Sequence, residues 1–287
     1  MDIEVPSCSI CLGSSDEQYL QYNLIVSGII LPIVGFIGLI GNFLVVIVYG
    51  SYESRKHSTN IYLAALAASD FCMICTALVL YVLEAWRHHS HQIIATMYGR
   101  STQYTFPIST ILQTTSVYFC VIAAADCFVR VVLSSKTKEA ICTPRFAKIT
   151  VLCITAISFA YNVPHFFELT SIICFDDRRN NSLSVQVCPT DLRTNVLYYQ
   201  LYYTYMYTIF MAVGPLLIIV ILNVFVVTAV FKKGASGNFY YYDTDTLSLI
   251  LVVFMFIFCN SAALLVNFIE MVFAEKVFFI SQFFIQI

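Results

Sequence analysis

The sequence contains little charge, and this shortage limits the class of protein that it can encode. Only 11% of its 287 residues are charged, whereas 59% are hydrophobic and 15% are aromatic. A soluble domain carries about 25% charged residues, and a disordered chain is far less apolar than this one. The formal net charge of −2 provides no positive field for binding nucleic acid. We therefore expect a protein that crosses a lipid bilayer several times and has no nucleic-acid partner.

Motifs of catalysis and metal binding are also lacking. The sequence shows no nucleophile–base pair, phosphate-binding loop or deaminase motif, so we do not expect an enzyme. His88, His89 and His91 lie close together in sequence. Three histidines in one loop are far more often solvated than metal-bound, so we expect no metal there.

Long apolar runs, in contrast, are abundant. A helix needs about 20 largely apolar residues to cross a bilayer. Runs of that length cover residues 24–50, 59–85, 102–133, 146–167, 198–231 and 246–273. A further run, 277–287, is about half as long as a span requires. We predict an all-α membrane protein, a seven-transmembrane helix bundle whose seventh helix is truncated.

The distribution of charge predicts the orientation of the bundle. Residues 1–23 contain acidic residues but no Lys or Arg. With this segment outside, the inner loops hold more Lys and Arg than the outer loops, as cytoplasmic loops usually do. We therefore predict an extracellular N-terminus (1–23) and a single membrane domain (24–287) in the plasma membrane. The glycosylation sequon at Asn180 then lies outside.

Short motifs occur in a fixed order along the spans. They are Gly41-Asn42-x-x-Val45, Leu66-Ala67-x-x-Asp70, Asp126-Cys127-Phe128, Pro215 and Phe256-x-x-Cys259. Each motif is weak alone, but this order and spacing resemble the rhodopsin-like (class A) G-protein-coupled receptors. Segments 142–145, 161–168, 203–207 and 259–264 are similar to the FMRFamide-type neuropeptide receptors of invertebrates. The resemblance implies a seven-transmembrane receptor domain, an extracellular amidated Arg-Phe peptide as ligand, and a heterotrimeric G protein as partner.

The sequence departs from the family pattern mainly on the signalling side. Cys127 occupies the position of the family's arginine, and Ala262 that of its sixth-span proline. The Asn-Pro-x-x-Tyr motif of the seventh span is absent from the sequence. These departures favour one alternative, a truncated or decoy receptor that does not signal. A second alternative is a six-span channel or transporter, although the sequence shows no internal repeat.

The predicted outer face is acidic and aromatic, which suits a cationic, aromatic peptide. Seven residues match positions that face the outer cavity in the resembled family, so the resemblance implies that they bind the ligand. They are Glu84, Ser109, Gln113, Glu168, Tyr207, Asn267 and Glu270. A ligand arginine would pair with Glu84 or Glu270, and we expect neutralising both to weaken binding at least about tenfold. The alternative is that these acids are ordinary solvated groups at helix ends.

Three further groups of residues follow from the resemblance. The first group matches the family's sodium site and consists of Asn42, Asp70 and Ser116. The alternative is that Asp70 is neutral and hydrogen-bonded.

The second group is expected to face the G protein and consists of Asp126, Cys127 and Arg130. Asp126 and Arg130 share a helix face. The alternative for that pair is a weak surface ion pair.

Val117, Pro215 and Phe256 match a packing relay in the centre of the bundle. A proline within a span weakens the helix locally and permits a hinge. The alternative is an inert kink with ordinary core residues around it.

Four of the eleven cysteines lie in segments predicted to be outside, where disulfides persist: Cys8, Cys11, Cys174 and Cys188. Four cysteines permit three pairings. The family's anchor cysteine at the top of the third span is replaced by Thr102. We therefore prefer the pair Cys174–Cys188, while pairing of either residue with the N-terminal segment stays open.

Overall fold

The computed structural model describes residues 5–8, 11, 17–176 and 182–235. The predicted sixth and seventh spans lie outside these described residues. So do four residues to which the sequence assigns a role: Asn180, Phe256, Asn267 and Glu270.

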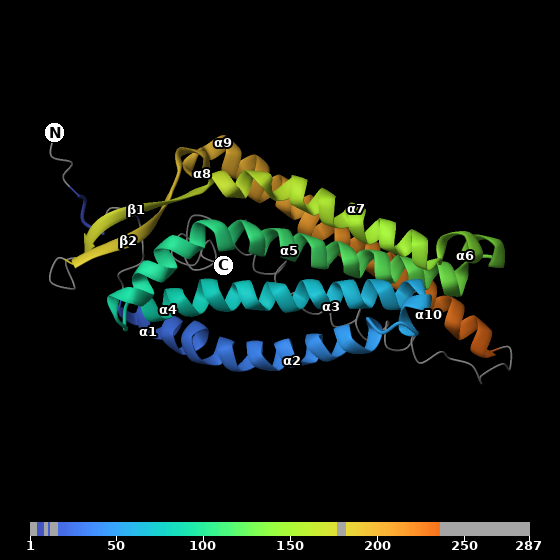
Figure 1. The fold of residues 1–287 in the computed structure, drawn as a ribbon. Helices are drawn as coiled ribbons and strands as arrows, with labels where there is room; N and C mark the ends of the chain where they lie inside the picture. The colour runs from blue at the N-terminus through green and yellow to red at the C-terminus, as the bar shows by residue number, and fades with distance from the viewer. Residues whose placement is uncertain (1–4, 9–10, 12–16, 177–181, 236–287) are drawn as a thin grey trace. The chain divides into compact units, whose positions relative to one another are not determined.

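Five helical segments are long and apolar enough to cross a membrane (Figure 1). They are Glu17–Tyr49, Ser58–Arg87, Gln92–Val132, Pro144–Phe167 and Val196–Ala229. Each covers all but the last one or two residues of one predicted span, or the whole of it, so the first five spans are confirmed as helices. The third begins ten residues before its apolar run, and the first begins within the predicted N-terminal segment. Helix formation, unlike membrane insertion, does not require apolar side chains, and hydropathy therefore misses such extensions.

The first three spans and the connection between the first two comprise α1 (Glu17–Ile25), η1 (Val26–Ile30), α2 (Leu31–Tyr49), η2 (Ser54–Lys56), α3 (Ser58–Ala77), η3 (Leu78–Val82), α4 (Leu83–Arg87) and α5 (Gln92–Val132). The elements that follow are α6 (Ser135–Ile141), α7 (Pro144–Asn162), η4 (Val163–Phe167), β1 (Leu169–Asp176), β2 (Ser182–Pro189), α8 (Asp191–Thr194), α9 (Val196–Tyr198), η6 (Tyr199–Met206), η7 (Thr208–Val213) and α10 (Gly214–Ala235). Helix α7 shows how the sequence sets these boundaries. Pro144 occupies its first position, where a missing N–H costs nothing, and the Thr143 hydroxyl accepts a hydrogen bond from the Phe146 N–H at 3.3 Å.

The chain divides into two compact units, which we describe separately. Unit 1 comprises residues 1–47, 67–116 and 154–201, and unit 2 comprises residues 48–66, 117–153 and 202–287.

The two strands of unit 1 form an antiparallel hairpin that two disulfides join to the N-terminal segment (Figure 1). Cys8 is bonded to Cys174 on β1, and Cys11 is bonded to Cys188 on β2. The Cys8 N–H also donates to the Phe175 carbonyl at 2.8 Å. The N-terminal segment is therefore fixed to both strands.

The predicted pair Cys174–Cys188 is wrong, and the register of the hairpin explains why. Cys174 lies opposite Ser184, whereas Cys188 lies opposite Thr170. The two cysteines are thus offset by four residues along the strands, or about 13 Å. A disulfide requires Cα atoms within about 7 Å of each other.

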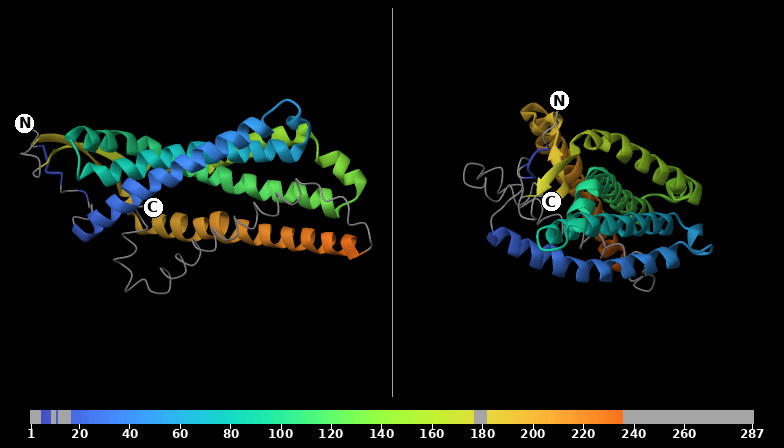
Figure 2. Two further views of the ribbon diagram at one scale, coloured as in Figure 1. Left: turned by 90° about the horizontal axis from the view of Figure 1, so that it is seen from below. Right: turned by 60° about the vertical axis from the view of Figure 1, so that its left-hand side comes forward.

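The hairpin packs closely against the beginning of α5 (Figure 2). A Cβ atom added at Gly99 would lie 2.1 Å from the Val185 carbonyl oxygen. The Ser171 hydroxyl donates to the Gly99 carbonyl at 2.5 Å. Only glycine permits this approach of strand to helix.

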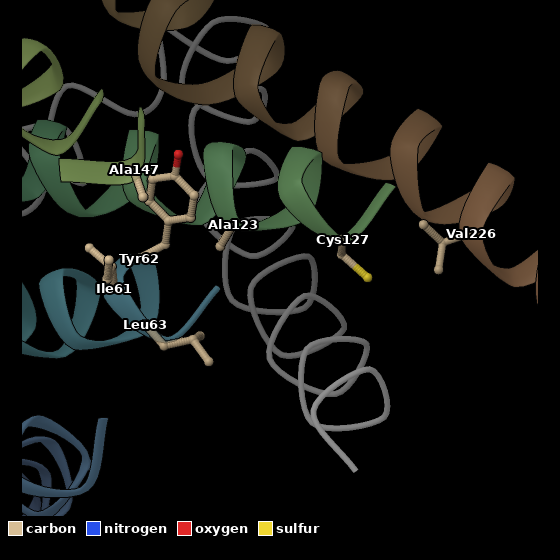
Figure 3. Close-up of a cluster of buried hydrophobic side chains, with 7 residues drawn as sticks. All are labelled: Ile61, Tyr62, Leu63, Ala123, Cys127, Ala147 and Val226. Atoms are coloured by element: carbon tan, nitrogen blue, oxygen red, sulfur yellow. The ribbon is translucent and has the colours of Figure 1, made fainter. Parts of the chain in front are cut away.

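The core of unit 2 is built from apolar side chains that range in size from alanine to tyrosine, on four helices (Figure 3). Its buried members are Ile61, Tyr62 and Leu63 of α3, Ala123 and Cys127 of α5, Ala147 of α7 and Val226 of α10. Cys120, Ala124 and Ile219 form a second cluster. Small residues let membrane helices approach closely, and dispersion contacts then hold them together.

Replacing Gly99 by alanine should destabilise the protein by about 1–3 kcal/mol, because the new methyl group overlaps the backbone of β2. Gly41→Ala is a matched control, since a Cβ there meets nothing within 4 Å. Both variants gain the same helix propensity. Thermal unfolding in detergent should show Gly99→Ala melting below Gly41→Ala, and equal melting temperatures would contradict the close approach.

Candidate functional site

Asp126 is the centre of a buried polar cluster in unit 2. Its side chain lies on α5 and is only 4% exposed. The Ser58 and Thr59 hydroxyls, in the first turn of α3, donate to its two carboxylate oxygens at 2.7 and 2.6 Å. Arg130 Nε donates to Oδ2 at 2.9 Å, and an Arg130 terminal nitrogen also donates to the Ser58 hydroxyl at 2.7 Å. We call these four residues the Asp126 cluster.

The expected pairing of Asp126 with Arg130 on one helix face is therefore present. Its interpretation as a surface ion pair is wrong, because the carboxylate is buried and accepts three donors from two helices. Ser58 and Thr59 were not singled out from the sequence. Their position at the start of a span, where hydroxyl side chains are common, gave no specific signal.

A thiol completes the surroundings of Asp126. Cys142, which lies between α6 and α7, hydrogen-bonds to the Asp126 carboxylate. Burial, reinforced by the negative charge of Asp126, raises the pKa of Cys142 to about 11. The thiol therefore stays protonated at neutral pH and acts as a donor. The neighbouring Cys127 instead turns into the apolar core of unit 2 and is 6% exposed (Figure 3).

Asp70 and Ser116, two of the three residues of the expected sodium site, meet in unit 1. The Ser116 hydroxyl on α5 donates to Asp70 Oδ1 on α3. Asn42, the third residue, donates from its side-chain amide to the Gly38 carbonyl of its own helix at 3.1 Å. Two side-chain oxygens of the expected set thus come together, fewer than a hard cation prefers.

Glu84, an expected ligand contact, lies in a second buried cluster in unit 1 and is 6% exposed. The Asn23 side chain hydrogen-bonds to it, and Arg87 provides a nearby positive charge. The Arg87 guanidinium also lies 5.0 Å from the centre of the Tyr98 ring. A ligand cation would have to compete with Arg87 for this carboxylate.

Glu168, at the junction between η4 and β1, is completely buried. Arg193 donates to its Oε2 at 2.6 Å, and the Tyr198 hydroxyl donates to Oε1 at 2.5 Å. His165 Nδ1 lies 2.9 Å from Oε1. The Phe106 ring packs against both the imidazole and the guanidinium, at 5.3 and 5.2 Å. In this conformation no ligand atom reaches Glu168, so its position does not support a direct ligand contact.

The remaining predicted residues occupy varied environments. On α5, Ser109 is partly buried and Gln113 is exposed. Tyr207, between η6 and η7, is partly buried. Val117 and Pro215 are both buried in unit 2, as a packing role requires.

The family of seven-transmembrane receptors of the rhodopsin type matches residues 41–287. The chain belongs to this family, which comprises receptors rather than enzymes. The family confirms the predicted fold class of a multi-pass, rhodopsin-like membrane protein.

Three curated relatives are similar along most of the chain. The probable G-protein-coupled receptor frpr-1 of Caenorhabditis elegans is 39% identical over 273 residues, which cover 90% of this chain and 70% of that protein. The FMRFamide receptor of Drosophila melanogaster is 29% identical over 201 residues, or 69% of this chain and 36% of the receptor. The FMRFamide peptide receptor frpr-18 of Caenorhabditis elegans is 25% identical over 249 residues, or 84% of this chain and 56% of that protein.

Replacing Asp126 by asparagine should destabilise the protein by about 1–3 kcal/mol, because the amide NH2 group would face donors and leave them unsatisfied. The exposed Glu139 of α6 supplies the control, Glu139→Gln, whose effect should stay within about 0.5 kcal/mol. Thermal unfolding in detergent measures both. If the two variants melt together, the Asp126 cluster does not hold α3 and α5 as described.

Proposed function

We propose that this protein is a G-protein-coupled receptor of the plasma membrane that is activated by an extracellular neuropeptide ending in Arg-Phe-amide. The observation that carries the proposal is the similarity, along 69–90% of the chain, to a probable G-protein-coupled receptor and to two receptors named for FMRFamide. The two disulfides of unit 1 support an extracellular N-terminus, since disulfides persist outside the cell.

The side chains of unit 1 support a cationic, aromatic ligand. Glu84 lies near Arg87, whose guanidinium packs against the Tyr98 ring. A ligand guanidinium beside Glu84 would pair with a buried carboxylate, which costs free energy while it has no partner.

Coupling to a heterotrimeric G protein is the second part of the proposal. On α5, Arg130 is the basic residue that follows Cys127 within one helical turn, and its side chain is 25% exposed. The alternative, a decoy receptor that binds peptide without signalling, is favoured by the thiol of Cys127, which is buried and cannot act as a cation. Binding and nucleotide exchange must therefore be measured separately.

Amidated Arg-Phe peptides should bind cells that express the receptor and should stimulate guanine-nucleotide exchange in their membranes. Replacing the peptide arginine by citrulline removes its charge and should weaken binding at least about tenfold. The receptor double variant Glu84→Gln/Glu270→Gln should lose a similar factor. Glu139→Gln, a change of an exposed carboxylate on α6, serves as the matched control.

The outcomes separate the hypotheses. Binding together with nucleotide exchange supports a signalling receptor, whereas binding without exchange supports the decoy. A failure of the whole set of amidated peptides to bind would overturn the proposed ligand class. If the citrulline peptide binds as well as its parent, recognition of the ligand's positive charge is refuted.

We also propose that sodium binds beside Asp70 and Ser116. The Ser116 hydroxyl uses its proton for Asp70, and its lone pairs remain available for a hard cation. Sodium should raise the melting temperature of the receptor relative to choline at equal ionic strength. Asp70→Ala should abolish that difference, and a sodium effect that persists in Asp70→Ala would place the ion elsewhere.

A further inference from the structure

Glu168 lies where the end of the fourth span, the hairpin and the beginning of the fifth span meet. It follows η4, the last turn of the fourth span, and precedes β1. Its backbone carbonyl accepts a hydrogen bond from the Thr190 N–H, directly after β2, at 2.8 Å. The main chain at Glu168 therefore holds the two ends of the hairpin together, and its completely buried side chain points away from solvent.

The Glu168 carboxylate connects segments that lie on either side of the hairpin in sequence. After the hairpin, Arg193 of α8 donates to Oε2 at 2.6 Å, and the Tyr198 hydroxyl of α9 donates to Oε1 at 2.5 Å. Before the hairpin, Nδ1 of His165 in η4 lies 2.9 Å from Oε1. These residues all belong to unit 1. One carboxylate thus joins the last turn of the fourth span to the first residues of the fifth.

The Arg193 guanidinium is held from a second direction by α5. It lies 5.2 Å from the centre of the Phe106 ring, and only 16% of the Arg193 side chain is exposed. Removing one member of a buried ion pair is costly, because the other member then stays buried without its counter-charge. The position of α8 therefore depends on the charge of Glu168.

We propose that Glu168 is a positioning residue that fixes the beginning of the fifth span to the end of the fourth, and that it influences peptide binding without touching the peptide. The second part of this proposal rests on the proposed function of a peptide receptor. Glu168 acts through Arg193 and Tyr198, so loss of its charge displaces a segment of the receptor and removes no contact with the ligand.

A double-mutant cycle between Glu168 and Arg193 tests the first part, because the cycle isolates the term that the two residues share. Glu168→Gln should lower the melting temperature of the purified protein by at least about 4 °C, since an amide NH2 group would then face the Arg193 guanidinium. In the Arg193→Gln background, the same change should raise the melting temperature, because it removes a buried carboxylate that has lost its guanidinium. An equal decrease in both backgrounds would overturn the proposal.

Asp191→Asn is the matched control, since Asp191 is an exposed carboxylate on the same helix as Arg193. It should shift the melting temperature by less than about 2 °C. A shift as large as that of Glu168→Gln would refute a specific role of the Glu168 charge.

Hydrogen–deuterium exchange shows which segment Glu168 holds. Glu168→Gln should speed amide exchange about fivefold in a peptide spanning residues 190–200. A peptide from α10, residues 217–229, should exchange at its original rate. Equal acceleration in both peptides would show general loosening and refute the positioning role. If Glu168→Gln does not fold, Tyr198→Phe, which removes one donor to the same carboxylate, provides the same comparison.

Peptide affinity tests the second part. Glu168→Gln should weaken an amidated Arg-Phe peptide and its citrulline analogue by the same factor, at least about threefold, because Glu168 does not touch the ligand. A smaller loss for the citrulline analogue would show that Glu168 contacts the ligand's positive charge, and it would overturn this part. If neither peptide binds the unaltered receptor, the proposed function fails and the second part fails with it. The thermal cycle uses no peptide and still decides the first part.

Discussion

Polar groups in a bilayer must be satisfied within the protein, and the internal architecture of both units depends on this constraint. Each unsatisfied group in hydrocarbon costs several kcal/mol. Asp126 meets the requirement with donors from two helices. Two of these donors, the Ser58 and Thr59 hydroxyls, come from the first turn of α3. The carboxylate therefore fixes where α3 begins relative to α5. The apolar core of unit 2 includes residues next to this cluster on both helices, among them Ile61 of α3 and Cys127 of α5. Dispersion contacts hold this core together, but they have no directional preference of their own.

The same constraint shapes unit 1 in a different way. Glu84 and Glu168 lie near arginines from the chain itself. A buried ion pair contributes little net stability, but it is costly to break by removing one partner. Removing Arg193 would therefore leave the fully buried Glu168 carboxylate short of a donor.

How much of the fold and of the candidate site the sequence could predict depends on how far apart the interacting residues lie along the chain. The first five spans follow from hydropathy, and the pairing of Asp126 with Arg130 follows from their spacing of one helical turn. Asp70 and Ser116 are 46 positions apart, and only the family resemblance brought them together. The disulfides could not be predicted, because they depend on the register of β1 and β2 and on an N-terminal segment 166 and 177 residues distant. Ser58 and Thr59 were missed because hydroxyl side chains carry no signal of a partner in another helix.

Near Cys127 on α5, the family's motif has lost its arginine, but another arginine lies close to the same position. Cys127 replaces a cation, and its thiol is absorbed into the apolar core. Arg130 follows three residues later, a rise of about 4.5 Å, on nearly the same face of the helix. Asp126 and Ser58 orient its guanidinium, and a quarter of the side chain stays exposed. A cation is therefore present within one turn of the position that Cys127 occupies. Because the Asp126 cluster itself accounts for the orientation of Arg130, this arrangement does not distinguish a signalling receptor from the decoy, and nucleotide exchange has to separate them.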